Sequence, residues 1–145
     1  MSQVTDERGN VFRFLFDGEY RPIQLTYPNG TYRQWMYDAR GYLSEERDPR
    51  GNYTFYRSDE AGNLLWMQEA DGNEHHFSYD TSGNLVHAKD RIREVSFRYG
   101  SLGTLLSRTQ NGRTVCFEYD TELQLTGIAN EGADQIGRAS CRERV

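Results

Sequence analysis

Four aspartates open the same five-residue motif, Asp-x-x-Gly-Asn, at Asp6, Asp48, Asp59 and Asp80. Carboxylate and amide oxygens are calcium ligands, but an EF-hand loop needs oxygens at alternating positions and a glutamate at its end. The motif has neither that spacing nor the nonapeptide period of other calcium-binding repeats. We expect a turn instead, in which the aspartate accepts hydrogen bonds from backbone N–H groups and the glycine supplies a positive φ.

Histidine and cysteine, the usual ligands of transition metals, are few. His75 and His76 are adjacent, and adjacent strand residues face opposite sides, so the two cannot easily share one zinc ion. His87 lies further along the chain. Cys116 stands between apolar residues with no histidine nearby, which predicts a buried thiol rather than a nucleophile. No pair of carboxylates is placed for acid–base work. We therefore predict no catalytic residue, metal site or cofactor, and no enzymatic activity.

The aspartate motif belongs to an internal repeat, the first feature to look for in a chain of this kind. An aromatic residue followed by aspartate recurs every 20 or 21 residues. The copies, two of them degenerate, are Phe16-Asp17, Tyr37-Asp38, Ser58-Asp59, Tyr79-Asp80, Tyr99-Gly100 and Tyr119-Asp120. Glycine follows three residues after the aspartate position, at Gly41, Gly62, Gly83 and Gly103. Leucine follows two residues later, at Leu43, Leu64, Leu85, Leu105 and Leu125.

Each repeat also contains a second turn and alternating residues. Asn29-Gly30, Asp71-Gly72 and Asn111-Gly112 are strong hairpin signals. Residues two apart, such as Phe77 and Tyr79, share one face of a strand. Two positions depart from the pattern, since Asp90-Arg91-Ile92 lacks the glycine and Leu123 stands where glycine is expected.

These elements predict an all-β chain of tandem β-hairpin repeats, about 20–21 residues each, that form a continuous, antiparallel, curving sheet. Each leucine after a turn should begin the next strand. Arginines beside carboxylates should form cross-strand ion pairs on the polar face.

Composition excludes several classes of function. The formal net charge of −5 argues against a nucleic-acid surface, which is normally basic. No stretch is long and apolar enough for a transmembrane helix. The first residues lack the basic and apolar segments of a Sec signal peptide.

The last eleven residues, Gln135–Val145, break every earlier pattern and contain no aromatic residue. Their back-translation, from the last two bases of the Gln135 codon onward, resembles a common short-read sequencing adapter base for base. We therefore expect residues 1–134 to be the repeat array, of about six units with the first and last incomplete, and residues 135–145 to be adapter read-through that is not native. On that view Cys116 is the one natural cysteine and forms no disulfide.

The pattern Tyr-Asp-x-x-Gly-x-Leu, complete at residues 37–43 and 79–85, resembles the YD repeat of Rhs proteins, and the resemblance covers residues 6–132. The repeat-motif residues, taken as structural, are Tyr37, Asp38, Gly41, Leu43, Asp59, Gly62, Leu64, Tyr79, Asp80, Gly83, Leu85, Tyr119 and Asp120. Related repeats occur in insecticidal toxin complexes and teneurins. In the family, the repeats form a sheet that spirals into a hollow shell around a C-terminal toxin.

The resemblance implies a structural segment of such a shell, acting in bacterial competition or virulence. Its partners would be the rest of the shell, the toxin domain or other cargo, and secretion machinery. Its location would be secreted, on the cell surface or delivered by a secretion system. No nucleic acid and no membrane span are expected.

A cell-surface or carbohydrate-binding repeat module, with a carbohydrate as partner, is the alternative. Choline- and glucan-binding repeats are also aromatic hairpins, but they need a tryptophan or tyrosine cage that recurs at one repeat position. Trp35 and Trp66 fall at different positions, which favours ordinary packing. For the third class, an enzyme fragment, the sequence offers no constellation of residues.

Overall fold

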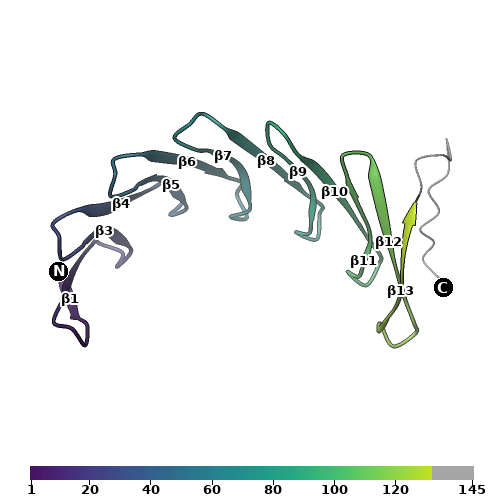
Figure 1. Ribbon diagram of the computed structural model, residues 1–145, viewed down its shortest axis with the longest axis horizontal. Helices are drawn as coiled ribbons and strands as arrows, with labels where there is room; N and C mark the ends of the chain where they lie inside the picture. The colour runs from purple at the N-terminus through teal and green to yellow at the C-terminus, as the bar shows by residue number, and fades with distance from the viewer. Residues whose placement is uncertain (132–145) are drawn as a thin grey trace. The chain divides into compact units, whose positions relative to one another are not determined.

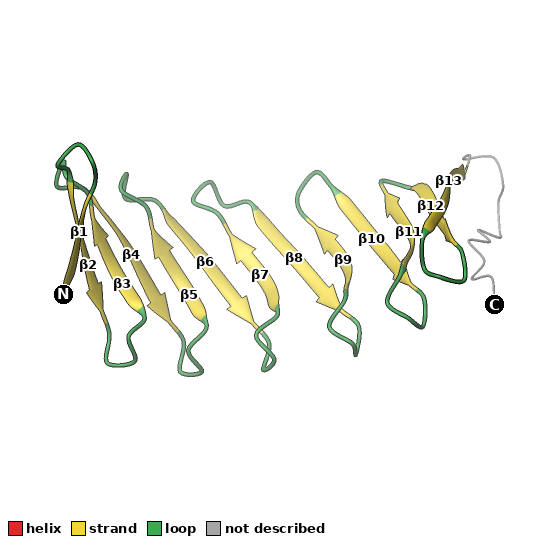
Figure 2. Cartoon of the chain, turned by 90° about the horizontal axis from the view of Figure 1, so that it is seen from below, coloured by secondary structure: helices red, strands yellow, loops and turns green. Residues whose placement is uncertain are grey.

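The structure, a computed structural model, describes residues 1–131 as β-strands joined by turns, with no helix in that part of the chain (Figures 1 and 2). The strands are β1 (Ser2–Thr5), β2 (Val11–Phe16), β3 (Pro22–Thr26), β4 (Tyr32–Tyr37), β5 (Leu43–Arg47), β6 (Tyr53–Ser58), β7 (Leu64–Gln68), β8 (Glu74–Tyr79), β9 (Leu85–Lys89), β10 (Glu94–Tyr99), β11 (Leu105–Gln110), β12 (Arg113–Tyr119) and β13 (Leu125–Glu131). The predicted all-β hairpin array is confirmed. The predicted boundary at residue 134 and the predicted adapter segment lie outside the described residues.

The chain divides into two compact units, Met1–Glu74 and His75–Val145. In the first unit, β1 to β7 pair antiparallel in chain order. In the second unit, β8 to β13 do the same. Each pair of neighbouring strands is thus a hairpin, as Figure 2 shows.

Most turns share one geometry because the chain repeats one turn sequence. At Asp59, the backbone N–H donates to the carbonyl of Asn63 at 2.9 Å, and Gly62 N–H donates back to the Asp59 carbonyl at 3.2 Å. Gly62 has a φ of 88°. This is a three-residue hairpin loop that needs a left-handed residue at its third position. The Asn111-Gly112 turn is the shorter, two-residue type with φ values of 48° and 79°.

The leucine after each first turn begins a strand, as predicted: Leu43, Leu64, Leu85, Leu105 and Leu125 open β5, β7, β9, β11 and β13. The residue that follows this leucine is an additional residue in its strand, skipped in the pairing with the preceding strand. Tyr37 pairs with Leu43 but Met36 pairs with Glu45, so Ser44 is a β-bulge. The same shift occurs at every first turn of the described chain, one residue past the strand start.

Each unit is a sheet with little deep core. Among described residues the buried ones are Leu106 and Cys116, both 7% exposed, and Ser107, 4% exposed. Half-buried aromatic residues instead occupy the position two before the tyrosine of the repeat. They are Phe14, Trp35 and Tyr56 in the first unit, and Phe77, Phe97 and Phe117 in the second.

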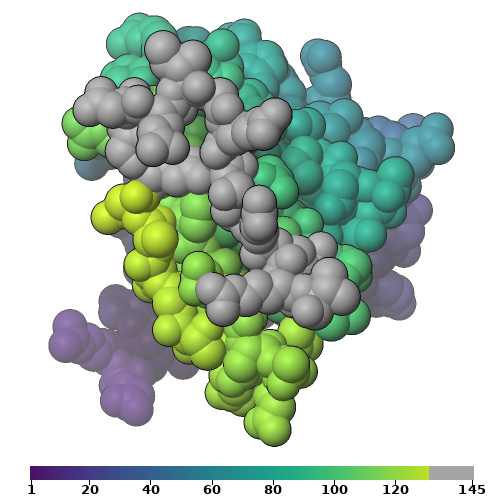
Figure 3. Space-filling model, turned by 90° about the vertical axis from the view of Figure 1, so that its right-hand side faces the viewer, coloured from purple at the N-terminus to yellow at the C-terminus, as the bar shows by residue number. Residues whose placement is uncertain are grey.

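The last described strand, β13, lies at the surface in Figure 3, where it is yellow. Its apolar side chains Leu125 and Ile128 are exposed. Within residues 1–131, the structure offers no helix that could cross a membrane.

Candidate functional site

The aspartate at the start of a turn organises the loop through its carboxylate. Asp59 Oδ1 accepts hydrogen bonds from the backbone N–H groups of Ala61 and Asn63, both at 2.9 Å, and Oδ2 accepts one from the Asn63 side chain at 2.9 Å. The Asn63 side chain, then the backbone N–H groups, lower the pKa of Asp59 below its ordinary value. Both carboxylate oxygens are therefore engaged in closing the turn.

The other three copies of the motif repeat this arrangement. Asp6, Asp48 and Asp80 accept the same pair of backbone hydrogen bonds and the same asparagine side-chain bond. In each, the asparagine side chain is the main cause of a lowered aspartate pKa. Asp38 differs because its fifth residue is Tyr42, whose backbone N–H is the main cause of the lowered Asp38 pKa.

The tyrosine of the Tyr-Asp step links one repeat to the repeat before it. Tyr37 Oη donates to the Pro22 carbonyl at 2.8 Å, Tyr99 Oη to the Leu85 carbonyl at 2.9 Å, and Tyr119 Oη to the Leu105 carbonyl at 3.1 Å. In every case, the acceptor is the first residue of the strand that follows the previous first turn. We call this hydrogen bond the tyrosine link. Sequence reasoning treated the tyrosine as a face-forming aromatic and missed the link.

The repeat with Ser58 in place of tyrosine is connected in another way. Arg40 Nη2 donates to the Ser58 carbonyl at 2.9 Å, and Tyr42 Oη donates to the Glu60 carbonyl at 3.2 Å. The Tyr42 ring lies so close to Gly62 that a Cβ there would meet Tyr42 Cε1 at 2.8 Å. Side chains of one first turn thus hold the backbone of the next.

Arg21 does the same between two earlier turns. Its Nε donates to Asp17 Oδ2 at 2.7 Å, and its guanidinium lies 4.6 Å from the centre of the Tyr37 ring. A Cβ on Gly41 would meet Arg21 Nη1 at 2.8 Å. Burial, then the nearby Asp17 carboxylate, raises the pKa of Tyr37 above its ordinary value.

The predicted cross-strand ion pairs are confirmed in part. Arg33 on β4 pairs with Glu46 on β5, and Tyr56 Oη donates to the same carboxylate at 3.4 Å. His87 Nε2 lies 2.9 Å from Glu94 Oε1 across β9 and β10, and this bond is the main cause of the lowered Glu94 pKa. Other arginine pairs of the described residues lie within single turns, between Arg21 and both Asp17 and Glu19, Arg40 and Asp38, and Arg93 and Asp90.

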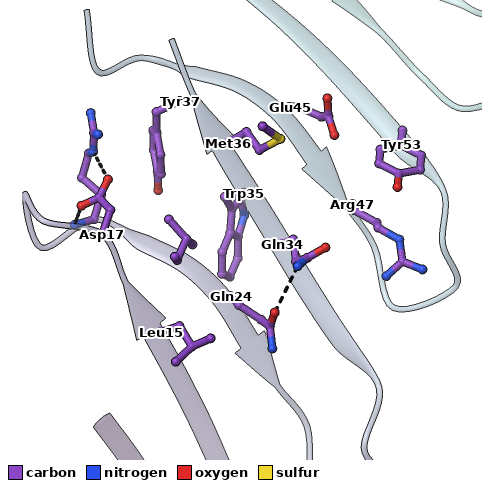
Figure 4. Close-up of a pocket in the computed structure, with 12 residues that line it drawn as sticks. Leu15, Asp17, Gln24, Gln34, Trp35, Met36, Tyr37, Glu45, Arg47 and Tyr53 are labelled. Carbon is purple, nitrogen blue, oxygen red and sulfur yellow. Dashed lines mark hydrogen bonds and ion pairs between the residues drawn. The ribbon is translucent and has the colours of Figure 1, made fainter. Parts of the chain in front are cut away.

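The first unit also contains a hollow of about 500 Å³ (Figure 4). Its lining includes Gln24, Gln34, Trp35, Glu45, Arg47 and Tyr53, from β3 to the start of β6. The sequence alone predicts that Trp35 serves only in packing. In the structure, Trp35 also lines this concave surface. Trp66 lies on β7, where the Arg57 guanidinium stacks over its ring at 5.0 Å.

The metal-ligand candidates are placed as the alternation of a strand requires. His75 is half-buried and His76 exposed on β8. Within residues 1–131, no group of three or more histidine, cysteine, aspartate or glutamate side chains is arranged to hold a metal ion.

Cys116 on β12 is buried, as expected, but the expectation that it forms no disulfide is wrong. The residue is disulfide-bonded. The expectation followed from treating residues 135–145 as adapter read-through, which left Cys116 as the one natural cysteine.

The fold and the repeated turns define a tandem β-hairpin repeat array. Among solved structures, the chain is similar to a complex of TcdB2, TccC3 and Cdc42, with a TM-score of 0.72 and 16% identity over 80% of this chain. It is also similar to the TcdB2–TccC3 complex at a TM-score of 0.71, and to the Tc holotoxin pore of Photorhabdus luminescens at 0.70, both at 16% identity. At the level of the fold, the comparison confirms the resemblance to YD-repeat proteins.

The chain corresponds to only 6–7% of the length of these toxin chains. No protein-family model and no curated protein matches the chain.

Proposed function

We propose that this chain is a segment of a YD-repeat wall that encloses or carries a C-terminal toxin or other cargo. The observation that carries the proposal is the tyrosine link. It ties the repeats of Tyr37, Tyr99 and Tyr119 to the main chain of the preceding repeat, at 2.8 Å, 2.9 Å and 3.1 Å. Such links suit a long array of repeats that must hold one geometry.

The mechanism of the proposed wall is geometric and needs no catalysis. Proteases bind substrates as extended strands, and here the strands inside each sheet already pair with neighbours on both sides. Hairpin turns closed by carboxylate hydrogen bonds leave short loops at the sheet ends. A sheet of this kind therefore separates an enclosed segment from proteases through its hydrogen bonding alone.

The fold likeness to Tc toxin structures supports the proposal, and the partners follow from it. They are further repeats of the same shell and the cargo that the shell carries, with secretion or cell-surface delivery as the setting. Because the enclosing role belongs to a whole shell, the longer protein is the right object for the test.

The test begins with long-read sequencing of the source locus through both ends of this reading frame. The protein encoded there is then treated with trypsin, beside its C-terminal segment expressed alone. We expect more Tyr-Asp repeats, and digestion of the C-terminal segment at least about tenfold slower inside the whole protein.

A matched pair of variants of the whole protein sharpens the result. Tyr99→Phe combined with Tyr119→Phe removes two tyrosine links and should speed cleavage of the enclosed segment. Tyr20→Phe changes an exposed tyrosine outside the links and should leave the rate unchanged. Equal digestion of the enclosed and isolated segments, or a frame without further repeats, would refute the proposal.

A further inference from the structure

One face of the first unit presents a row of side chains that crosses five strands. The register pairs Leu15 with Gln24, Gln24 with Gln34, Gln34 with Arg47 and Arg47 with Tyr53. Cross-strand partners lie on the same face of a sheet. All five residues line the hollow of about 500 Å³ (Figure 4), a volume within the range of small-ligand sites.

An aromatic platform stands at one end of this row. The rings of Tyr53 and Phe55 are 6.2 Å apart between centroids and nearly parallel, with an angle of 11° between their planes. Both are exposed, Tyr53 at 42% and Phe55 at 38%. The two rings thus present exposed aromatic surface at this end of the row.

The polar side chains of the row are held in place before any ligand arrives. Gln34 Nε2 donates to Gln24 Oε1 at 3.1 Å, and Gln24 Nε2 donates to Thr26 Oγ1 at 3.1 Å. The Arg47 guanidinium is stacked over the Tyr32 ring at 4.7 Å. A glutamine amide has two donors and an acceptor, and a guanidinium has five donors, so both keep capacity to bind a ligand.

We propose that this face of the first unit binds an oligosaccharide. The apolar C–H face of a pyranose ring would lie on the Tyr53–Phe55 platform, and its hydroxyl groups would bond to Gln34, Arg47 and Glu45. Hydroxyls both donate and accept, which matches a row that combines amide, guanidinium and carboxylate groups. A lipid acyl chain would use the platform and leave this polar row unmatched.

The site goes beyond the wall function because its aromatic pair, Tyr53 and Phe55, occurs in one repeat only among the described residues. Five residues before the tyrosine position, the other repeats have Val11, Tyr32, Glu74, Glu94 and Thr114 in place of Tyr53. Three residues before that position, none of the other repeats has a phenylalanine, tyrosine or tryptophan where Phe55 stands. The proposed site is therefore a single sugar site built on an ordinary repeat, unlike modules whose aromatic cage recurs.

The test applies the 145-residue chain to an array of linear neutral oligosaccharides. The array includes the hexasaccharides of β-1,4-linked glucose and β-1,4-linked N-acetylglucosamine. Affinity for the best ligand is then measured by isothermal titration calorimetry. We expect saturable binding, weakened about tenfold or more by Tyr53→Ala and by Phe55→Ala, as for loss of an aromatic anchor.

Tyr20→Ala is the matched control, since Tyr20 is an exposed tyrosine of the same unit outside the hollow. It should bind as the unchanged chain does, and circular dichroism establishes that all three variants keep the β fold. Absence of saturable binding to any sugar overturns the proposal, as does binding unchanged by both platform variants. Either result leaves the proposed wall function intact, because that function requires no ligand.

Discussion

The tyrosine of the repeat makes two kinds of contact, one through its ring and one through its hydroxyl. Its ring adds to the half-buried aromatic face, and its hydroxyl reaches back to a carbonyl 14 residues earlier, from Tyr99 to Leu85 and from Tyr119 to Leu105. That carbonyl lies beside the β-bulge, where the regular ladder is interrupted. The hydroxyl thus satisfies a backbone group at the point where strand pairing is irregular.

Removing one tyrosine link should destabilise the chain measurably. We expect Tyr99→Phe to lower the free energy of unfolding by about 0.5–1.5 kcal/mol, the usual net value of one hydrogen bond. Tyr20→Phe, at a tyrosine that is 89% exposed, should have no effect. Urea unfolding followed by circular dichroism measures both, and equal midpoints for the two variants would contradict the link's contribution.

The turn aspartates predict a particular response to acid. The folded-state pKa values of Asp6, Asp48, Asp59 and Asp80 lie below the ordinary 3.8, so the folded chain binds protons less readily than the unfolded chain. The stability that these groups contribute is fully present above pH 3.8 and is lost as the pH falls through the lowered values. Urea midpoints measured from pH 6 down to pH 2 should fall steeply below about pH 4.

The asparagine at the end of the motif provides the control for that response. Asn63→Ala removes the main cause of the lowered Asp59 pKa. NMR titration should then show the Asp59 pKa moving up toward its ordinary value while that of Asp48 stays in place. No movement at Asp59 would show that the side-chain bond does not set its pKa.

At the scale of the element, glycines with the same φ differ in what surrounds them. Gly62 and Gly30 have φ values of 88° and 83°, but a Cβ meets the Tyr42 ring at Gly62 and nothing within 4 Å at Gly30. Gly30→Ala should cost roughly 1–2 kcal/mol from left-handed backbone alone. Gly62→Ala should cost more, because the Tyr42 ring must move and its bond to Glu60 is strained or lost. Equal losses in thermal unfolding would mean that the ring moves without cost.

Strands and turns could be predicted from the sequence because their signals are side chains. Leucine marks the start of β5, β7, β9, β11 and β13, and Asp-x-x-Gly marks the first turns that begin at Asp38, Asp59 and Asp80. The bulge could not be predicted, since the extra residues, such as Ser44, Leu65 and Val86, share no chemistry. The tyrosine link was missed for a related reason. Its acceptor is a main-chain carbonyl, which every residue type has, so no sequence pattern indicates it.

Leu123 shows a limit of the glycine signal. The sequence pattern expects glycine there, yet Leu123 adopts a φ of 63° and its N–H still bonds to the Asp120 carbonyl at 3.1 Å. Tyr20 does the same at the equivalent position, with a φ of 60°. The carboxylate bonds of Asp120 and Asp17 hold these turns closed in spite of the backbone strain.

At the scale of the whole molecule, the small number of buried residues determines how readily chains associate in solution. Few described residues are buried, aromatic faces are half-covered, and β1 pairs with β2 alone among the described strands. Exposed strand edges and apolar faces favour pairing between chains. We expect concentration-dependent association of the 145-residue chain in sedimentation velocity.

Val4→Lys places a charge on β1, where Val4 is exposed, and should weaken that association. A chain that stays monomeric at every concentration would contradict this picture.

The main-chain acceptor of the tyrosine link has a consequence for how such genes change. Every residue has a carbonyl, so the link places no demand on the side chains of the preceding repeat, as the acceptors Pro22 and Leu85 show. Unequal recombination that adds or deletes one whole repeat would leave each remaining tyrosine with an acceptor. Arrays of this kind can therefore change length over generations without any compensating substitution at the new junction.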